Sequence, residues 1–540
     1  MKLKRWIRDN IQTKHIDTMK KESLKLTMII LGAILFNIIF WNEKLGINTI
    51  LFDIFIITSV FYLYPTSIKN KTSIWLAVGH LITAAMVLVN NTWLSKIGFS
   101  ITLLLFVSFS QYIHRSVLYA GGSIISNYIL AIPNFFRQFK SVKGKIINLH
   151  GLSRPVRMLL IPFILLAVFS MIYAFANAVF LNIASDILTA VQRWIASIFD
   201  WFSIARFSFF LLGILVTAGL ILKAKSNYFS DADLQQKDSL SRKKNDLKKW
   251  RESSFSDLLS VIIGKASKGM LAIKNEFTIG LISLVLLNIL LLLINSIDVK
   301  YVWLGFTFSK DVSLSAYVHE GAGLLILSII LAMLLLLFFF RGNLNFYKKN
   351  KWLRYGAYLW IFQNLFLVVS VFIRDYYYVS HYGLAYKRIG LLFFLAMVIA
   401  GLLTVFLKIH FTKTTYYLLR INAWAAIVLL IFATTVHWDY AIAKYNLERK
   451  SSIPLDVPFL LSLSDKALPL LEKNKDVFVN DNHTWIYYKG KEINYNAVDF
   501  YEYRKKDFLA EQKQYTWLSW NAADAYVKQA LNTNQLSLLK

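Results

Sequence analysis

Long apolar runs dominate this sequence and restrict the folds open to it. The first run, LKLTMIILGAILFNIIFW at 24–41, is long enough for an α-helix to cross about 30 Å of hydrocarbon. Lipid leaves unpaired backbone groups without hydrogen-bond partners, so open sheets are excluded there. The runs predict an all-α polytopic membrane protein with about eleven transmembrane helices. The expected spans are 24–41, 47–64, 74–90, 97–113, 157–181, 203–222, 277–297, 316–340, 353–373, 385–407 and 416–437.

Composition supports the membrane class. Of the 540 residues, 56% are hydrophobic and 17% are charged, whereas soluble domains average about 25% charged residues. The chain contains no cysteine. This excludes thiolate catalysis, disulfide bonds and cysteine-ligated metals.

Basic residues are unevenly distributed between alternate loops. With the N-terminus placed inside, the cytoplasmic pieces carry 37 of the 60 Lys and Arg residues, and the short external loops carry 9. Cytoplasmic loops are enriched in such residues. We therefore expect a cytoplasmic N-terminus and an external C-terminal domain. The net charge of +29 then reflects topology, and we expect no nucleic-acid partner.

Two further segments are expected at the membrane surface. The segment 117–136 is apolar enough for a twelfth span, but crossing there would leave 18 basic residues in the inner short loops and 28 in the outer ones. That reverses the usual bias, and the Gly121–Gly122 pair and Pro133 favour an interfacial or re-entrant segment. The segment 183–199 predicts an amphipathic helix along the outer interface, with packing between spans as its simplest role.

Charge and hydropathy divide the chain into five parts. The longest internal loop contains SRKKNDLKKWRESSF, which suits either a solvated helix or a site for anionic lipid. The expected parts are 1–23, a basic cytoplasmic segment; 24–222, a first helix group; 223–276, a basic cytoplasmic loop; 277–437, a second helix group; and 438–540, an external aromatic-rich domain of mixed α and β structure.

Polar side chains near the outer ends of the spans form the candidate functional set. Ionisable groups are costly to place in a membrane, so each is a functional candidate. They either pair with one another and fix helix ends, or line a polar cavity that opens outward. His80 lies nearer the middle of its span. The set is Asp53, Arg206, His319, Glu320, Arg374, Asp375, Tyr382 and Arg388.

Catalytic and cofactor motifs do not occur in the sequence. It contains no P-loop, no GxGxxG after a strand and no GxSxG. His319 and Glu320 lack the HExxH spacing that puts two imidazoles on one helix face. We expect no cofactor and no metal, and an enzyme activity stays uncertain and is not favoured.

Three short motifs resemble an uncharacterised bacterial family of multi-pass membrane proteins, DUF4173. They are Tyr382–Arg388, which is similar to a YGLTxxR hairpin but has Ala385 in place of Thr; Asp456–Ser464, which is similar to a D-x-x-YLLSLS run but has Phe459 in place of Tyr; and Trp517–Asn521, a W-x-SWN run. The resemblance spans roughly 316–525. It implies a multi-pass protein of the bacterial cytoplasmic (inner) membrane and carries no activity.

Three functions remain open. The first is an envelope-associated scaffold, sensor or assembly factor that binds a partner through the external C-terminal domain. The second is a transporter or lipid-handling protein that uses the polar cluster near the outer face. The third is a membrane enzyme acting on envelope lipid or glycan. The lipid bilayer is a partner in all three, and an envelope protein, lipid or glycan is a possible further one.

Overall fold

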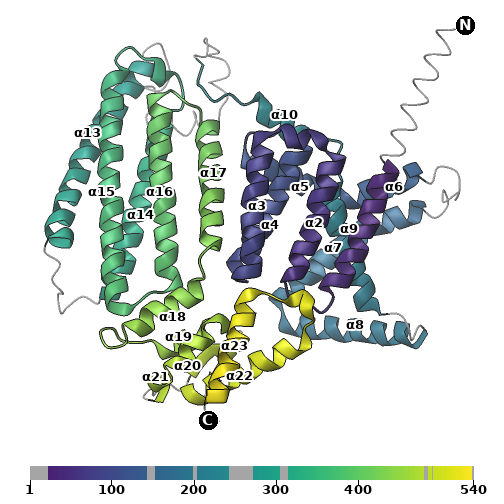
Figure 1. Cartoon of the computed structure of the whole chain (residues 1–540). Helices are drawn as coiled ribbons and strands as arrows, with labels where there is room; N and C mark the ends of the chain where they lie inside the picture. The colour runs from purple at the N-terminus through teal and green to yellow at the C-terminus, as the bar shows by residue number, and fades with distance from the viewer. Residues whose placement is uncertain are drawn as a thin grey trace, which may run out of the picture.

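The computed structural model is helical throughout its transmembrane part (Figure 1). It describes residues 22–142, 153–198, 203–241, 272–304, 314–479, 485–488, 491–494 and 496–537. Most of the basic segment 1–23 and the centre of the basic loop 223–276 lie outside these ranges.

Eight helices among the described residues are long and apolar enough to cross a membrane. They are the first helix (Glu22–Phe40), α3 (Lys71–Val89), α4 (Trp93–Gln111), α9 (Ile204–Ile221), α13 (Ala272–Asp298) continued by η3 (Val299–Trp303), α15 (Asn350–Tyr382), α16 (Tyr386–His410) and α17 (Thr415–Thr434). The multi-pass helical class is therefore confirmed.

Eight of the eleven expected spans meet this criterion among the described residues. Three expected spans form the helices α2 (Ile47–Leu63), α7 (Ser153–Ala176) and α14 (Leu314–Phe339). The described apolar part of each is shorter than the spans above. For α2 the cause is local, because Pro65 begins the 3-10 turn η1 (Pro65–Lys69) directly after the helix cap at Tyr64. Proline lacks the N–H that a continuing helix needs.

The first bundle consists of the first helix, α2, α3, α4, α5 (Val117–Ile129) and α9, packed around an apolar core. Ile56, Val60, Phe106 and Val107 are completely buried there. Side-chain caps from Asn70 and Thr92 fix the starts of α3 and α4, because each satisfies an N–H at the first turn.

The segment 117–136 forms two short helices rather than one long one. α5 has 13 residues, and α6 (Ala131–Val142) follows after a break at Leu130. At a rise of 1.5 Å per residue, α5 is about 20 Å long, so it does not cross the hydrocarbon alone. α5 packs against α4, α9 and α10 (Tyr228–Gln235).

α8 (Ala178–Ile198) contains most of the predicted amphipathic segment 183–199. Figure 1 shows it lying across the lower ends of the first bundle, at the level of the C-terminal domain. Its apolar residues Ile183, Ile187, Leu188 and Val191 are exposed, so they are available to lipid.

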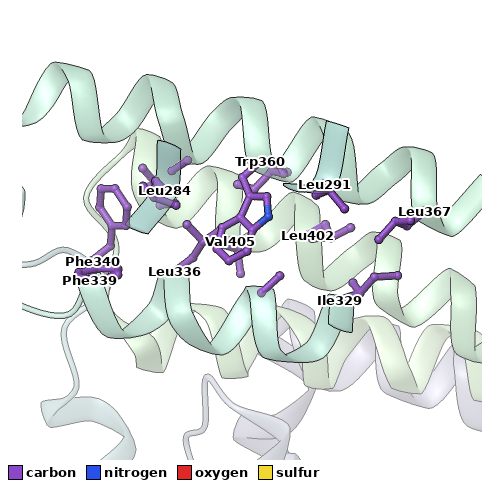
Figure 2. Close-up of a cluster of buried hydrophobic side chains, with 14 of the residues drawn as sticks. Leu284, Leu291, Ile329, Leu336, Phe339, Phe340, Trp360, Leu367, Leu402 and Val405 are labelled. Carbon is purple, nitrogen blue, oxygen red and sulfur yellow. The ribbon is translucent and has the colours of Figure 1, made fainter. Parts of the chain in front are cut away.

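The second bundle joins α13, α14, α15 and α16 around a continuous apolar core. Figure 2 shows Leu284, Leu336, Trp360 and Leu402 meeting there, one from each helix. The 3-10 turn η4 (Asn343–Phe346) connects α14 to α15. α17 packs against α16 on one side and against α3, α4 and α5 on the other, so it joins the two bundles.

The C-terminal domain is helical. It contains α18 (Trp438–Glu448), α19 (Val457–Ser462), η5 (Asp465–Ala467), α20 (Leu468–Lys473), α21 (Asp476–Val479), α22 (Ala497–Gln514), η6 (Trp517–Ser519) and α23 (Ala522–Ser537). The expected mixed α/β domain is not seen. One antiparallel hairpin of two four-residue strands, β1 (Trp485–Tyr488) and β2 (Lys491–Asn494), makes no sheet layer, and the core comes from the helices.

Candidate functional site

Asp53 lies in the middle of the first bundle, where it contacts His80. The Asp53 Oδ1 and His80 Nε2 atoms are 2.7 Å apart, and His80 Nδ1 lies 3.0 Å from Thr102 Oγ1. Thr83 Oγ1 is 2.8 Å from the same Thr102 oxygen. All four side chains are buried, and the ring of Phe106 stacks on His80. These side chains form one buried hydrogen-bond network that joins α2, α3 and α4.

Arg206 lies apart from this group at the exposed start of α9. Its Nε donates to Asn37 Oδ1 at 3.2 Å, and the Asn37 amide donates back to the Arg206 carbonyl at 3.1 Å. His319 and Glu320 belong to α14, but their side chains lie outside the described part of the structure.

Arg374 is buried in the second bundle and donates to Asp298 through both terminal guanidinium nitrogens, at 2.7 and 3.2 Å. Asp375 is buried beside it in α15. Further toward the opposite end, Gln363 donates to Asn288 Oδ1 at 2.8 Å. α13 and α15 are therefore joined by polar contacts along their length, and the ion pair fixes the ends.

Tyr382 ends α15 and Arg388 lies in the first turn of α16, on either side of the connecting turn. Gly383 adopts φ +79°, and Arg388 donates to the carbonyls of Tyr382 and Gly383. The Asn446 side chain from α18 accepts from the Leu384 N–H at 2.6 Å and donates to its carbonyl at 2.9 Å. A Cβ at Gly383 would lie 2.4 Å from Asn446 Oδ1. The turn attaches the C-terminal domain to the second bundle.

The described members of the expected polar set thus lie in three separate places: the first bundle, the start of α9, and the end of α15 with the following turn. The partners Asp298 and Asn446 were missing from the set. Asp298 was assigned to a loop after its span, and Asn446 lies in the tail, so no local pattern singled out either residue.

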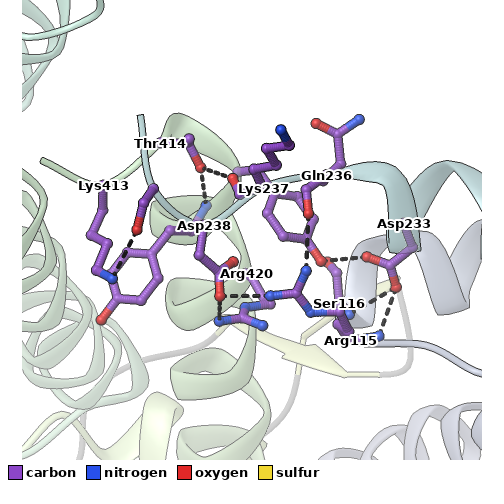
Figure 3. A network of polar contacts seen from close by, with 12 residues as sticks. Arg115, Ser116, Asp233, Gln236, Lys237, Asp238, Lys413, Thr414 and Arg420 are labelled. Atoms are coloured by element: carbon purple, nitrogen blue, oxygen red, sulfur yellow. Dashed lines mark hydrogen bonds and ion pairs between the residues drawn. The ribbon is translucent and has the colours of Figure 1, made fainter. Parts of the chain in front are cut away.

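A second polar network lies at the end of the molecule opposite the C-terminal domain (Figure 3). Asp238 accepts from Arg115 at 2.6 Å and from Arg420 at 2.9 Å. Ser239 pairs with Lys413 in an isolated β-bridge. These contacts join the α4–α5 turn, the segment after α10 and the α16–α17 turn, and the basic loop continues directly from them.

Asp233 anchors the other half of this network. Its carboxylate accepts from the backbone N–H groups of Arg115 and Ser116 at 2.7 and 3.0 Å and from the Tyr416 hydroxyl at 2.5 Å. Burial alone would raise the pKa of Asp233, but the hydrogen bonds from His114, Tyr416 and the backbone hold this pKa below its ordinary value. These contacts fix the loops of this end to one another.

The W-x-SWN run attaches the C-terminal domain to the first bundle. The Lys44 N–H donates to Ser519 Oγ at 2.8 Å, and the Ile47 N–H donates to the Trp520 carbonyl at 3.0 Å. The Ser519 hydroxyl also contacts the Glu43 carboxylate. The turn after α22 therefore lies directly on the loop between the first helix and α2.

Two further observations show how closely these loops fit. A Cβ at Gly46 would lie 2.5 Å from the carbonyl oxygens of Ser519 and Trp520. Lys44 Nζ pairs with Glu511 at 2.7 Å. Burial alone would lower the pKa of Lys44, but the Glu511 carboxylate raises it above its ordinary value.

A cavity of about 460 Å³ lies beside this contact, between the end of α22 and α23. Three of its lining residues, Thr516, Ser519 and Trp520, also hold the Glu43–Ile47 loop. The full lining is Gln512, Tyr515, Thr516, Trp517, Ser519, Trp520, Asn521, Asp524, Ala525, Lys528, Gln529 and Asn532.

Asp524 is the acidic group of the cavity wall. It pairs with Lys466 and accepts from the Asn521 amide at 2.9 Å. Burial alone would raise the pKa of Asp524, but Lys466 and Asn521 hold it below its ordinary value. The carboxylate is thus ionised and already paired at neutral pH.

Within the described residues, no group of three His, Asp or Glu side chains is placed to hold a metal ion. The arrangement therefore combines a multi-pass helical membrane protein with a domain that is fixed to both of its bundles and carries a cavity with both polar and aromatic lining residues.

A family model for a domain of unknown function, DUF4153, matches residues 52–474. The chain belongs to this family. The match begins in α2 and ends after α20, so it covers both bundles and part of the C-terminal domain. Comparison with curated proteins and with solved structures found no match.

The expected membership of DUF4173 is wrong, because the matching family is DUF4153. The motifs behind the expectation have local structural roles. Gly383 forms a helix-ending turn, Asp456 accepts from the Phe459 N–H at the start of α19, and the Trp517–Asn521 run lies outside the matched residues. Caps and turns of this kind recur in unrelated proteins, so they discriminate poorly between families.

Proposed function

We propose that this protein is an envelope-associated scaffold or sensor whose C-terminal domain receives a ligand. One observation carries the proposal: Thr516, Ser519 and Trp520 line the cavity and also hold the loop Glu43–Ile47. A ligand in the cavity therefore contacts the same turn that attaches the domain to the first bundle.

This shared turn gives a physical route from binding to the membrane helices. A ligand shifts an equilibrium only by its difference in affinity for the two states. A ligand that contacts the turn in its docked geometry binds that geometry more tightly, and so it stabilises docking. The same domain is attached to the second bundle through Asn446, so a change in docking alters how the bundles are held together.

The proposal places the C-terminal domain outside the cytoplasmic membrane of a bacterium. Figure 1 supports one feature of this orientation, since the domain and α8 lie at one end of the helices and α10 at the other. The basic loop 223–276 leaves from the α10 end, where positive charge favours the cytoplasm.

Site-specific photo-crosslinking in cells tests the proposal. A photo-reactive amino acid replaces Trp520, which is 47% exposed in the cavity wall, or Tyr503, which is 46% exposed on α22 away from it. We expect a defined adduct at position 520 and none at 503. The same labelling at both positions, or no adduct at 520, would contradict ligand binding in the cavity.

The buried pair of Asp53 and His80 supports a second candidate, a transporter or lipid-handling protein. A His–Asp contact inside a membrane bundle is a common element of ion and proton pathways. If this pair takes part in transport, Asp53→Asn should abolish uptake or lipid handling while the amount of protein in the membrane stays the same. Arg374 gives no comparable support to an enzyme, because its guanidinium is bound bidentately to Asp298.

A further inference from the structure

The cavity between α22 and α23 has two kinds of wall. Aromatic rings come from Tyr515, Trp517 and Trp520, and amide side chains come from Gln512, Asn521, Gln529 and Asn532. Its volume of about 460 Å³ lies within the range of small-ligand sites, which is about 300–1,000 Å³. The cavity is therefore large enough for a small ligand, and its wall offers both aromatic surface and hydrogen-bonding groups.

We propose that this cavity binds a saccharide, either the head group of a glycolipid or a segment of a free glycan. Sugar hydroxyls both donate and accept hydrogen bonds, and amide side chains also do both. A pyranose ring has an apolar C–H face that packs against an aromatic ring. Trp and Tyr combine an apolar surface with a polar edge, so they fit a ligand with both characters.

The charges of the wall restrict the ligand further. Asp524 is paired with Lys466 and Asn521, so its charge is compensated. Lys528 is the other charged lining residue. A neutral or anionic sugar therefore fits, and a cationic ligand is disfavoured.

Exposure of the indole rings gives an independent reason to expect an occupant. Trp517 is 66% exposed and Trp520 is 47% exposed. Exposed aromatic side chains that line one site are typical of binding surfaces. Trp rings also lie at membrane interfaces, so phospholipid contact is the competing occupant that the experiment must separate.

This inference rests on the proposed function, since it names the ligand of the same cavity. The full-length protein in nanodiscs is applied to an array of bacterial glycans, and glycolipids in the nanodiscs form a second arm. We expect saturable binding in one arm, which identifies the source. Trp517→Ala should weaken binding by about tenfold or more through loss of the ring, while Tyr503→Ala keeps it and Trp517→Tyr retains most of it.

Several results would contradict the proposal of saccharide binding. They are no binding in either arm, equal binding by wild type and Trp517→Ala, or an adduct at position 520 that is a polypeptide or a phospholipid. A polypeptide adduct rejects the saccharide and leaves the proposed function standing. Absence of any adduct at 520 rejects the proposed function itself.

Discussion

The backbone N–H of Lys44 donates to Ser519 Oγ at 2.8 Å, although the two residues lie 475 positions apart in the chain. This bond joins the loop between the first helix and α2 to the turn between α22 and α23 of the C-terminal domain. With the Ile47–Trp520 backbone bond and the Lys44–Glu511 pair, it makes the domain part of the transmembrane structure. The predictions below follow from such contacts.

Gly46→Ala should separate the C-terminal domain from the first bundle. The new Cβ would lie 2.5 Å from two backbone carbonyl oxygens, which cannot rotate away as a side chain does. Because the chain has no cysteine, cysteines at Tyr62 and Tyr503 accept a single pair of spin labels. We expect a narrow distance distribution in the parent and a broad one in Gly46→Ala. Gly121→Ala, with no atom within 4 Å, is the control and should stay narrow.

Gly383→Ala should destabilise the attachment to the second bundle. The backbone of Gly383, with φ +79° and ψ −177°, lies in a region that is essentially restricted to glycine and costs another residue about 1–3 kcal/mol, and the Cβ also meets Asn446 Oδ1. We expect a lower thermal unfolding midpoint in detergent than for Gly390→Ala, whose Cβ meets no atom within 4 Å. Equal midpoints for the two variants would contradict the role given to this turn.

Asp53→Ala should lower the stability of the protein more than replacing both Asp53 and His80 with leucine. Asp53→Ala leaves the His80 Nε2 atom buried without its partner, and a buried polar group without a hydrogen bond costs about 1–3 kcal/mol. The double variant Asp53→Leu/His80→Leu restores an apolar interior next to Phe106. We therefore expect both the wild type and the double variant to have higher thermal unfolding midpoints than Asp53→Ala. A double variant less stable than Asp53→Ala would show that the contact is not a simple buried pair.

Asp238→Asn should loosen the end of the molecule shown in Figure 3, because one carboxylate holds both Arg115 and Arg420. The Leu240 N–H donates to the Thr412 carbonyl at 2.9 Å, so its hydrogen exchange reports on this contact. We expect faster exchange in Asp238→Asn and little change in Asp231→Asn, an acidic neighbour in α10. Unchanged exchange at Leu240 would contradict the anchoring role.

Acid should weaken the C-terminal domain. Burial alone would raise the pKa values of Asp524 and Glu472, but their partners hold both below the ordinary values of 3.8 and 4.5. Lys466 pairs with Asp524, and Tyr501, Lys475 and Lys505 contact Glu472. A depressed folded-state pKa adds stability above the unfolded value, and this stability is lost as pH falls through the folded value. Unfolding followed from pH 7 to 3 should show this loss, and Asp524→Asn should flatten it. An unaltered pH profile would argue against the Lys466 pair.

Sequence patterns predicted the helical class because lipid forces each crossing segment to satisfy its own backbone. They also placed the second helix closely, since the expected span 47–64 corresponds to α2, which ends at Leu63 just before Pro65. The expected mixed α/β structure of the tail was wrong, since its described strands form only the β1–β2 hairpin and the helices supply the core.

The candidate site was harder to predict, because its contacts join distant residues. Asp53 and Arg374 were recognisable as costly membrane groups, but their partners His80 and Asp298 lie 27 and 76 positions away. The run Trp517–Asn521 was noted only as a family motif. Its contact with Lys44 has no local signal, since pairing at that separation depends on the packing of the whole fold.

Hydrogen exchange at the Lys44 amide tests the central claim most directly, because this N–H is the donor to Ser519. In full-length protein in nanodiscs, we expect slow exchange in wild type and fast exchange in Ser519→Ala. Ser462→Ala, which removes only a local bond to the Phe459 carbonyl, should keep the wild-type rate. A Lys44 amide that exchanges at the unprotected rate in wild type would show that the C-terminal domain is not fixed to the first bundle.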